Sequence, residues 1–248
     1  MHCRDLGLSA ALCITAPGGK PALPRSVPPF ARVRERRLET AHAGTPSSTS
    51  SCHRAGCSRV KALRASMRRR RVQLSPGQLA AHSASIAHSL WQLPLLARCQ
   101  RIACYMAIDG EVDCTGFMEA AVARGRRIFL PVVHGRGLLF AAWHPGIPMA
   151  RNRYGIPEPL SDAATWLRGT QLDVVLAPLV AFDAGGRRLG MGGGYYDRSF
   201  AFTRQRGSWQ RPRLVGLAHE FQCVASLPAR SWDVGMHAVV TEAGVRLF

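Results

Sequence analysis

Apolar residues in this chain gather into short runs, which polar, glycine-rich or proline-rich stretches separate. The densest run covers residues 173–182, where valine and leucine dominate and no polar alternation interrupts them. A strand that is buried on both faces of a parallel sheet has this pattern, because helices cover both of its sides. The run therefore predicts a central strand of an α/β sheet.

The remaining pattern predicts further strands and helices. Ser75-Pro76-Gly77-Gln78 forms a capping box with proline at the first helical position, and apolar residues at helical spacing follow it to about Leu93. Other helices are predicted from Asp113 or Thr115 to Gly125, over 161–168 and over 195–206, with a long loop at 145–159. Strands are predicted at 101–107, 127–133, 138–143, 213–218 and 238–241.

These elements predict a single three-layer α/β domain with a mostly parallel central sheet, spanning residues 60–248. Strand, helix and strand over residues 101–133 predict a right-handed parallel unit. Residues 1–59 have no sustained pattern and are rich in Pro, Ser, Gly and Arg, so we expect a disordered basic tail there. No apolar run reaches the roughly 18 residues that a membrane-spanning helix needs, and we expect no membrane partner.

The formal net charge of +18 would suggest a nucleic-acid partner if the domain carried it. Residues 1–75 carry 15 Lys or Arg against 3 Asp or Glu, a net of +12, whereas residues 76–248 carry 18 against 12. An RNA-binding protein that uses the tail and Arg68–Arg71 stays an alternative. Single-strand binders interleave aromatic and basic residues, and the tail has only Phe30. We expect no obligate nucleic acid, and we interpret Arg68–Arg71 as a solvated helix face.

The eight cysteines contain no C-x-x-C pair, so the sequence gives no support for a structural zinc site. Cys104 lies in an apolar run and is expected to be a small core residue. This cysteine usage is typical of a reducing, cytoplasmic location.

The chemistry of the chain is concentrated just after residues 173–182. Gly190, Gly192, Gly193 and Gly194 precede Tyr195, Tyr196 and Asp197, which begin the predicted helix. Glycines let backbone N–H groups approach a phosphate closely, and a helix start adds unpaired donors. Arg187 and Arg188 add positive charge, and Asp197 offers the oxygen ligand that Mg²⁺ prefers. The stretch predicts a nucleotide phosphate site, although neither the P-loop nor the dinucleotide fingerprint fits its spacing.

Residues 180–198 contain the pattern V-A-F-D-x-x-G-x-R-L-G-x-G-G-G-Y-Y-D-R. This pattern resembles the signature of the 5-formyltetrahydrofolate cyclo-ligase family, also called 5,10-methenyltetrahydrofolate synthetase, and the resemblance runs from about Lys61 to Glu242. It implies cyclisation of 5-formyltetrahydrofolate to 5,10-methenyltetrahydrofolate, driven by ATP and Mg²⁺, with release of ADP and phosphate. We expect the protein to be a cytoplasmic monomer.

The resemblance also implies roles for single residues. Arg188 and Tyr195 are expected to act in catalysis, and Asp197 and Asp233 to hold Mg²⁺. The folate is expected to contact Met106, Glu111, Met191, Gly192, Gly193, Gly194 and Tyr195. ATP is expected to contact Val60, Lys61, Arg64, Arg188, Leu189, Gly190, Met191, Gly192, Gly193, Gly194, Tyr195 and Tyr196.

Two positions depart from the family pattern. Lys61 stands one residue closer to Leu63-Arg64 than in the family's K-x-x-L-R segment, and Gly193 stands where some members carry lysine. Glu111 fits well, because it follows a predicted strand in a D-G-E-V-D turn, where open α/β sheets bind ligands. Its neighbours Asp109 and Asp113 have simpler interpretations as caps of a turn and of a helix.

Alternatives remain for the tail and for the function. An arginine-rich tail is also typical of a transit peptide, and residues 6–14 faintly resemble a signal sequence. We favour a third interpretation, in which translation starts at Val60, because family members begin near such a segment. A sugar-phosphate isomerase or an acyl-CoA transferase would also bind anions at a glycine loop, but no separate set of catalytic carboxylates is evident.

Overall fold

The computed structural model describes residues 49–205 and 211–248, with side chains for residues 58–204 and 211–248. Residues 1–48 of the predicted disordered tail lie outside the described residues, whereas residues 49–59 are helical. Helix α1 (Thr49–Val72) runs through the predicted boundary between residues 59 and 60. Among the described residues, no helix is long and apolar enough to cross a membrane.

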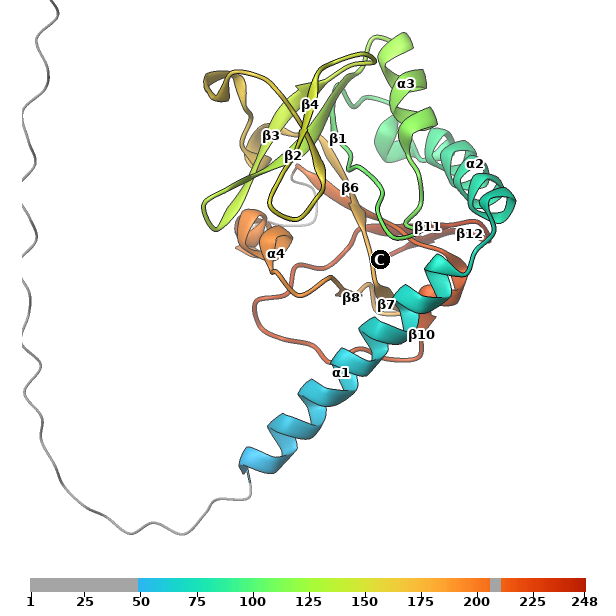
Figure 1. The fold of residues 1–248 in the computed structure, drawn as a ribbon, viewed down its shortest axis with the longest axis vertical. Coiled ribbons are helices and arrows are strands. Elements are labelled where there is room, and N and C mark those ends of the chain that lie inside the picture. The colour runs from blue at the N-terminus through green and yellow to red at the C-terminus, as the bar shows by residue number, and fades with distance from the viewer. Residues whose placement is uncertain (1–48, 206–210) are drawn as a thin grey trace, which may run out of the picture. The chain divides into compact units, whose positions relative to one another are not determined.

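A seven-stranded sheet forms the centre of the fold, in the order β12-β11-β9-β6-β1-β2-β3 (Figure 1). The five inner strands are parallel, and the edge strands β12 and β3 run antiparallel to their neighbours. The bounds are β1 Arg101–Ala103, β2 Arg127–His134, β3 Gly137–Trp143, β6 Val174–Pro178, β9 Arg213–Leu217, β11 Ala238–Thr241 and β12 Gly244–Leu247. The mostly parallel α/β sheet predicted from the sequence is confirmed.

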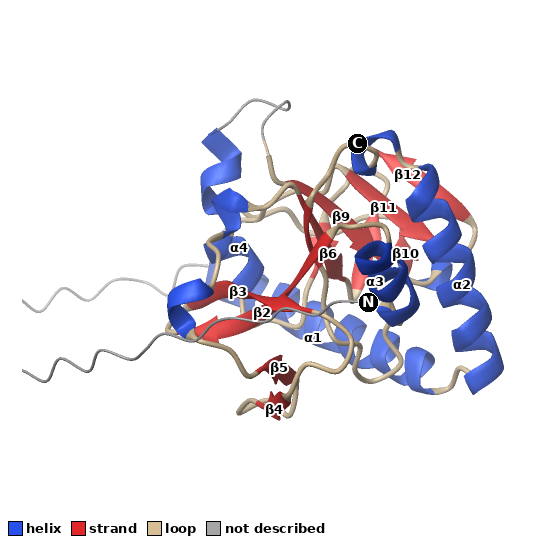
Figure 2. Ribbon diagram, turned by 90° about the horizontal axis from the view of Figure 1, so that it is seen from above, coloured by secondary structure: helices blue, strands red, loops and turns tan. Residues whose placement is uncertain are grey.

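Helices cover both faces of this sheet (Figure 2). On one face, α2 (Pro76–Gln92) and α3 (Thr115–Ala123) pack Ile86, Leu90 and Phe117 onto alternate strand residues. On the other face, α4 (Tyr195–Ser199) and the segment after it place Phe200 against Phe140 and the remaining strand residues. Because all residues of 174–177 are buried, β6 is covered on both faces, as its apolar run predicted.

The capping box is present as predicted. The Gln78 backbone N–H donates to Ser75 Oγ at 3.2 Å, and the Gln78 side chain accepts from the Ser75 backbone N–H at 2.9 Å. The α3 start is also as predicted, since Asp113 Oδ1 accepts from the Thr115 backbone N–H. Short 3₁₀ helices complete the helical segments: η1 Pro94–Leu96, η2 Ala163–Thr165, η3 Gly169–Gln171, η4 Ala201–Gln205 and η5 Glu220–Gln222.

Several predicted boundaries were wrong. The strand predicted at 173–182 breaks after Pro178, and its second part, β7 (Ala181–Asp183), joins β8 (Arg188–Leu189) and β10 (Cys223–Val224) in a separate sheet. The predicted loop at 145–159 contains the antiparallel pair β4 (Met149–Arg151) and β5 (Pro157–Pro159). The helix predicted at 161–168 is only η2, and that at 195–206 is α4 followed by η4.

Candidate functional site

A cavity of about 290 Å³ lies beyond the carboxyl ends of β1 and β6, where the main sheet gives way to loops. Open α/β sheets bind ligands at this end of their strands. Among the described residues, every predicted site residue except Lys61 lines the cavity: Val60, Arg64, Met106, Glu111, Arg188, Leu189, Gly190, Met191, Gly192, Gly193, Gly194, Tyr195, Tyr196, Asp197 and Asp233. Segments that are far apart in the sequence therefore meet at one site.

The glycine loop adopts backbone angles that require glycine. Gly192 has φ +108° and Gly194 has φ +64°, values that L-residues with side chains rarely adopt. Arg64, from α1, donates from Nε to the Gly190 carbonyl oxygen at 2.8 Å and so joins this helix to the loop. The helix that follows, α4, has only five residues, so its dipole contributes less than the longer predicted helix would.

Arg188 connects the loop to Asp197 and to the segment that carries Asp233. Its Nη2 donates to Asp197 Oδ1 at 2.6 Å, and its Nη1 donates to the Val234 carbonyl oxygen. Asp197 Oδ1 also accepts from the Val234 backbone N–H at 3.3 Å, which places Asp197 beside the segment that carries Asp233. Asp233 in turn accepts from the Arg230 backbone N–H through Oδ2. The two carboxylates thus belong to one side of the cavity.

Tyr195 lies in a polar cluster that the sequence did not predict. Its hydroxyl is 2.7 Å from the Tyr154 hydroxyl and accepts from Arg153 Nη2 at 2.7 Å. The hydrogen bond to Tyr154 is the main cause that lowers the pKa of Tyr195, and Arg153 lowers it further. Arg198 also lies over the Tyr195 ring. The phenol is therefore held in place by three side chains.

Glu111, in the segment that follows β1, also lines the cavity and is almost completely buried. Its Oε1 accepts from Arg71 Nη1 at 3.2 Å, and its Oε2 accepts from the Ile108 backbone N–H at 3.3 Å. Burial raises the pKa of Glu111 above its ordinary 4.5, although the Arg71 charge opposes this. Arg71 is 1% exposed, so the interpretation of Arg68–Arg71 as a solvated face was wrong for this residue.

Sequence reasoning missed much of the cavity wall. Residues of the β4–β5 hairpin line it, and so do hydrophobic residues near the ends of β2 and β3. The loop after β10 contributes as well. The missed lining residues include Pro131, Val133, Leu138, Asn152, Tyr154, Ile156, Pro157, Glu158, Leu227, Pro228, Arg230 and Trp232. Within the predicted loop, Asn152 and Glu158 are the polar residues that could have indicated this part of the wall. Their side chains hydrogen-bond at 2.7 Å.

The family model of the 5-formyltetrahydrofolate cyclo-ligase family matches residues 58–242. The chain belongs to the 5-formyltetrahydrofolate cyclo-ligase family. The matched range contains every residue that lines the cavity, and it begins inside α1.

Curated members of the family are similar over nearly their whole length. The 5-formyltetrahydrofolate cyclo-ligase of Escherichia coli K12 is 38% identical over 182 residues, which cover 72% of this chain and 98% of that protein. The Haemophilus influenzae protein of the same name is 33% identical over 183 residues, covering 72% of this chain and 95% of the relative. Cyclo-ligase activity, the function predicted from the sequence, is confirmed at the level of the family.

Solved structures of the family share the fold. The NMR structure of the Aquifex aeolicus 5,10-methenyltetrahydrofolate synthetase aligns with a TM-score of 0.63 at 31% identity, covering 76% of this chain and 92% of that chain. The Mycoplasma pneumoniae synthetase aligns with a TM-score of 0.57 at 25% identity and 98% coverage of that chain. The three-layer α/β domain is thus the family's fold.

Proposed function

We propose that this cyclo-ligase binds 5-formyltetrahydrofolate and Mg-ATP together in the described cavity and uses the γ-phosphoryl group to drive ring closure. The observation that supports this most is the meeting of Arg64, Glu111, the 188–197 segment and Asp233 at one cavity. These segments come from different parts of the chain, and each carries the charge that one of the two ligands requires.

The loop residues fit a nucleotide phosphate. A Cβ on Gly193 would lie 3.0 Å from the Tyr195 ring, and one on Gly194 would lie 2.7 Å from Arg198 Nη1. A side chain at Gly193 would press on the Tyr195 ring, which lines the cavity, and one at Gly194 would press on Arg198. With glycine at both positions the backbone stays open to a ligand. We place the phosphates against Arg64, Arg188 and the backbone of 190–194, with Val60, Leu189, Met191 and Tyr196 beside the nucleotide. Lys61 does not line the cavity, so its predicted contact with ATP has less support than that of Arg64.

The two carboxylates fit a magnesium ion. Asp197 and Asp233 offer oxygen ligands, and Mg²⁺ in nucleotide sites is held by one or two carboxylates together with substrate phosphates. When bound there, the ion supplies charge neutralisation for the phosphates. Asp197 is 27% exposed and paired with Arg188, so the carboxylate can exchange its partner without a large desolvation penalty.

In this reaction the protein positions the reactants and stabilises the charge that develops on them. A formamide carbonyl is a poor electrophile, so its oxygen first accepts the γ-phosphoryl group and ADP leaves. The substrate's N10 then attacks the activated carbon, and phosphate leaves with the former carbonyl oxygen and takes up the proton that N10 loses. Phosphoryl transfers depend on alignment and charge stabilisation, and Arg188 is the residue we assign to the transferring group. We place the folate ring between Tyr195, Met106 and Glu111, whose carboxylate can accept two N–H donors.

The direct test mixes the protein with Mg-ATP and 5-formyltetrahydrofolate and follows the absorbance of methenyltetrahydrofolate. We expect the absorbance to rise only when all three components are present, with one ADP released per product. A rise that needs no ATP, or a protein that forms no product, would contradict the proposal. A salt titration of RNA binding, with and without residues 1–59, tests the RNA-binding alternative.

We also propose that residues 60–248 form the complete catalytic domain and that the enzyme acts as a cytoplasmic monomer. Residue 60 is the first of the predicted ligand contacts that line the cavity, which supports this boundary. The Arabidopsis thaliana relative is named as mitochondrial, so the basic N-terminal segment is the part to test for import. A fluorescent fusion that stays cytoplasmic with residues 1–59 present supports the proposal, and import into mitochondria contradicts it.

A further inference from the structure

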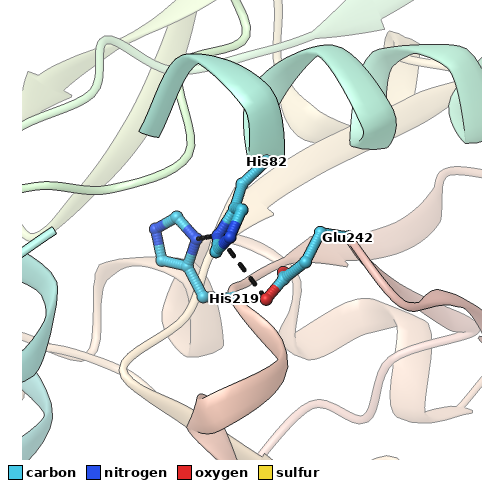
Figure 3. A group of neighbouring side chains, drawn as sticks. All are labelled: His82, His219 and Glu242. Atoms are coloured by element: carbon cyan, nitrogen blue, oxygen red, sulfur yellow. Dashed lines mark hydrogen bonds and ion pairs between the residues drawn. The ribbon is translucent and has the colours of Figure 1, made fainter. Parts of the chain in front are cut away.

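His82, His219 and Glu242 come together in a cluster (Figure 3). None of the three is among the residues that line the cavity. His82 lies on α2, His219 directly before η5, and Glu242 between β11 and β12. The two Nδ1 atoms are 3.0 Å apart, and His82 Nδ1 is 3.5 Å from Glu242 Oε1. The family signature includes none of these residues, and the cyclisation chemistry does not use them.

The hydrogen bonds around the cluster fix which atoms face its centre. His219 Nε2 is 3.0 Å from the Gly110 carbonyl oxygen, and because a carbonyl only accepts, Nε2 carries the proton. The Nδ1 lone pair of His219 therefore points at His82. Both Glu242 carboxylate oxygens accept from the Glu220 backbone N–H, at 3.1 and 3.0 Å. Metal-binding histidines and carboxylates are oriented by outer hydrogen bonds of this type.

Two of the three separations between the ligand atoms are close to those around a small tetrahedral ion. With metal–ligand bonds of about 2.0–2.1 Å, the ligand atoms of a tetrahedral zinc site lie roughly 3.3–3.4 Å apart. The two measured separations of 3.0 and 3.5 Å fall on either side of this value, and all three atoms lie within 4.8 Å of one another. Calcium and magnesium prefer six or more oxygen ligands, so two imidazoles and one carboxylate favour zinc.

Access and charge also suit a cation. His219 is fully buried, whereas His82 and Glu242 are 23% and 21% exposed, so an ion can enter from solvent on their side. A metal binds the unprotonated nitrogen of an imidazole, and His219 Nδ1 faces the cluster because Nε2 is taken up by Gly110. The hydrogen bond joining the two Nδ1 atoms needs one proton, and an entering ion would replace that proton.

We propose that His82 Nδ1, His219 Nδ1 and a Glu242 carboxylate oxygen bind one Zn²⁺ ion, with the fourth position open to water. The site joins α2 to the ends of β9 and β11. Through the bond from His219 to Gly110 it reaches the turn that carries Glu111, at the wall of the cavity.

The test measures Zn²⁺ binding to the full, metal-stripped chain by competition with a chromophoric chelator. We compare the wild type with His82→Ala and Glu242→Gln, which change partly exposed ligands, and with His88→Ala as a control. His88 lies on the same helix and pairs with Gln92. We expect one Zn²⁺ to bind at this site, with affinity at least about tenfold weaker in both ligand variants and unchanged in His88→Ala.

Cobalt(II) separates this site from cysteine ligation elsewhere in the chain. Tetrahedral Co²⁺ bound by nitrogen and oxygen gives visible bands without the near-ultraviolet band of a thiolate ligand. We expect those visible bands to be lost in His82→Ala. The proposal is overturned if the wild type binds no Zn²⁺, if both ligand variants bind it as tightly, or if a thiolate band accompanies all of the bound cobalt.

Discussion

Two arginine–carboxylate pairs each contribute their carboxylate to the cavity lining, and they differ mainly in how exposed that carboxylate is. Arg188 and Asp197 are 2.6 Å apart, and the Asp197 carboxylate is 27% exposed at the cavity wall. Arg71 and Glu111 are 3.2 Å apart, with side chains only 1% and 6% exposed. Arg71 Nε and Nη2 have no hydrogen-bond partner among the described residues.

Because of this difference in exposure, the Arg188–Asp197 pair can exchange partners, whereas the Arg71–Glu111 pair cannot. A partly exposed carboxylate such as Asp197 can release its arginine and turn to a metal ion, because water compensates the change on its side, while the buried Arg188 turns to a phosphate. A buried carboxylate such as Glu111 is left without its arginine partner if the arginine moves, and this costs several kcal/mol. We infer that the Asp197 side handles the charged and changing ligand, while the Glu111 side is a fixed recognition surface.

The largest expected effect comes from breaking the buried pair. Arg71→Met leaves Glu111 without its charge partner, and we expect the free energy of unfolding to fall by about 3–5 kcal/mol. The double variant Arg71→Met, Glu111→Gln removes both charges and should recover part of this loss. Urea unfolding monitored by circular dichroism measures both values.

The matched control is Arg68→Met, one helical turn earlier. Arg68 pairs with Asp109 at 2.6 Å, but both side chains are exposed, so its loss should change stability by no more than about 1 kcal/mol. Equal destabilisation by the two substitutions would remove the distinction between buried and exposed pairs.

The next effect is on catalysis at the exchangeable pair. Arg188→Met should lower kcat/KM by roughly 10²–10³-fold, the usual loss when a group that stabilises transition-state charge is removed. Its neighbour Arg187 is half exposed and does not line the cavity, so Arg187→Met should retain most activity. Steady-state kinetics with varied ATP tests this, and similar losses in both variants would contradict the assignment.

Asp197→Asn should also reduce activity and raise the Mg²⁺ concentration needed for half-maximal rate, because a charged oxygen ligand is lost. Raised Mg²⁺ should restore part of the rate. If the variant is fully active and its rate is as sensitive to Mg²⁺ as that of the wild type, Asp197 is not a ligand.

A smaller effect is expected from pH. Burial raises the pKa of Glu111 above 4.5, so its carboxylate protonates at a higher pH than an exposed glutamate does as the solution is acidified. Folate affinity should therefore fall with decreasing pH before exposed carboxylates titrate, and Glu111→Gln should lack that component. Calorimetric titrations from neutral pH downward would show whether the two proteins differ in this way.

The smallest effect is expected from the N-terminal segment. A chain that starts at residue 60, with methionine in place of Val60, should keep its turnover, since the family match begins only at residue 58. A chain that starts at Met67 lacks Arg64 and should lose ATP affinity. Equal loss in both chains would contradict the proposed domain boundary.

The sequence predicted the parts of this molecule that depend on local pattern. The uniform burial of 174–177 and the Ser75 capping box follow from residues that are neighbours in the chain. Contacts between residues that are far apart in the chain gave no such pattern in the sequence. Leu179 and Val180 look like the continuation of β6, but the Gln222 side chain donates to both of their carbonyl oxygens, and the chain turns into a second sheet there.

The same limit applies to the site. The glycine loop and Glu111 were identified because they resemble a family pattern within short segments. Arg71 was misplaced, because its burial depends on contacts with Glu111 and Leu179, 40 and 108 residues away. The contacts of Tyr195 with Arg153 and Tyr154 also needed the folded β4–β5 hairpin, which the spacing of 145–159 did not reveal.

The most direct test of the two-sided cavity is calorimetric binding of each ligand alone to Glu111→Gln and to Arg188→Met. The Gln side chain replaces one acceptor by a donor, so folate affinity should fall by tenfold or more while affinity for an ATP analogue stays near that of the wild type. Arg188→Met should show the opposite loss. If each substitution weakens both ligands equally, or if Glu111→Gln leaves folate binding unchanged, the division of the cavity into a nucleotide side and a folate side is wrong.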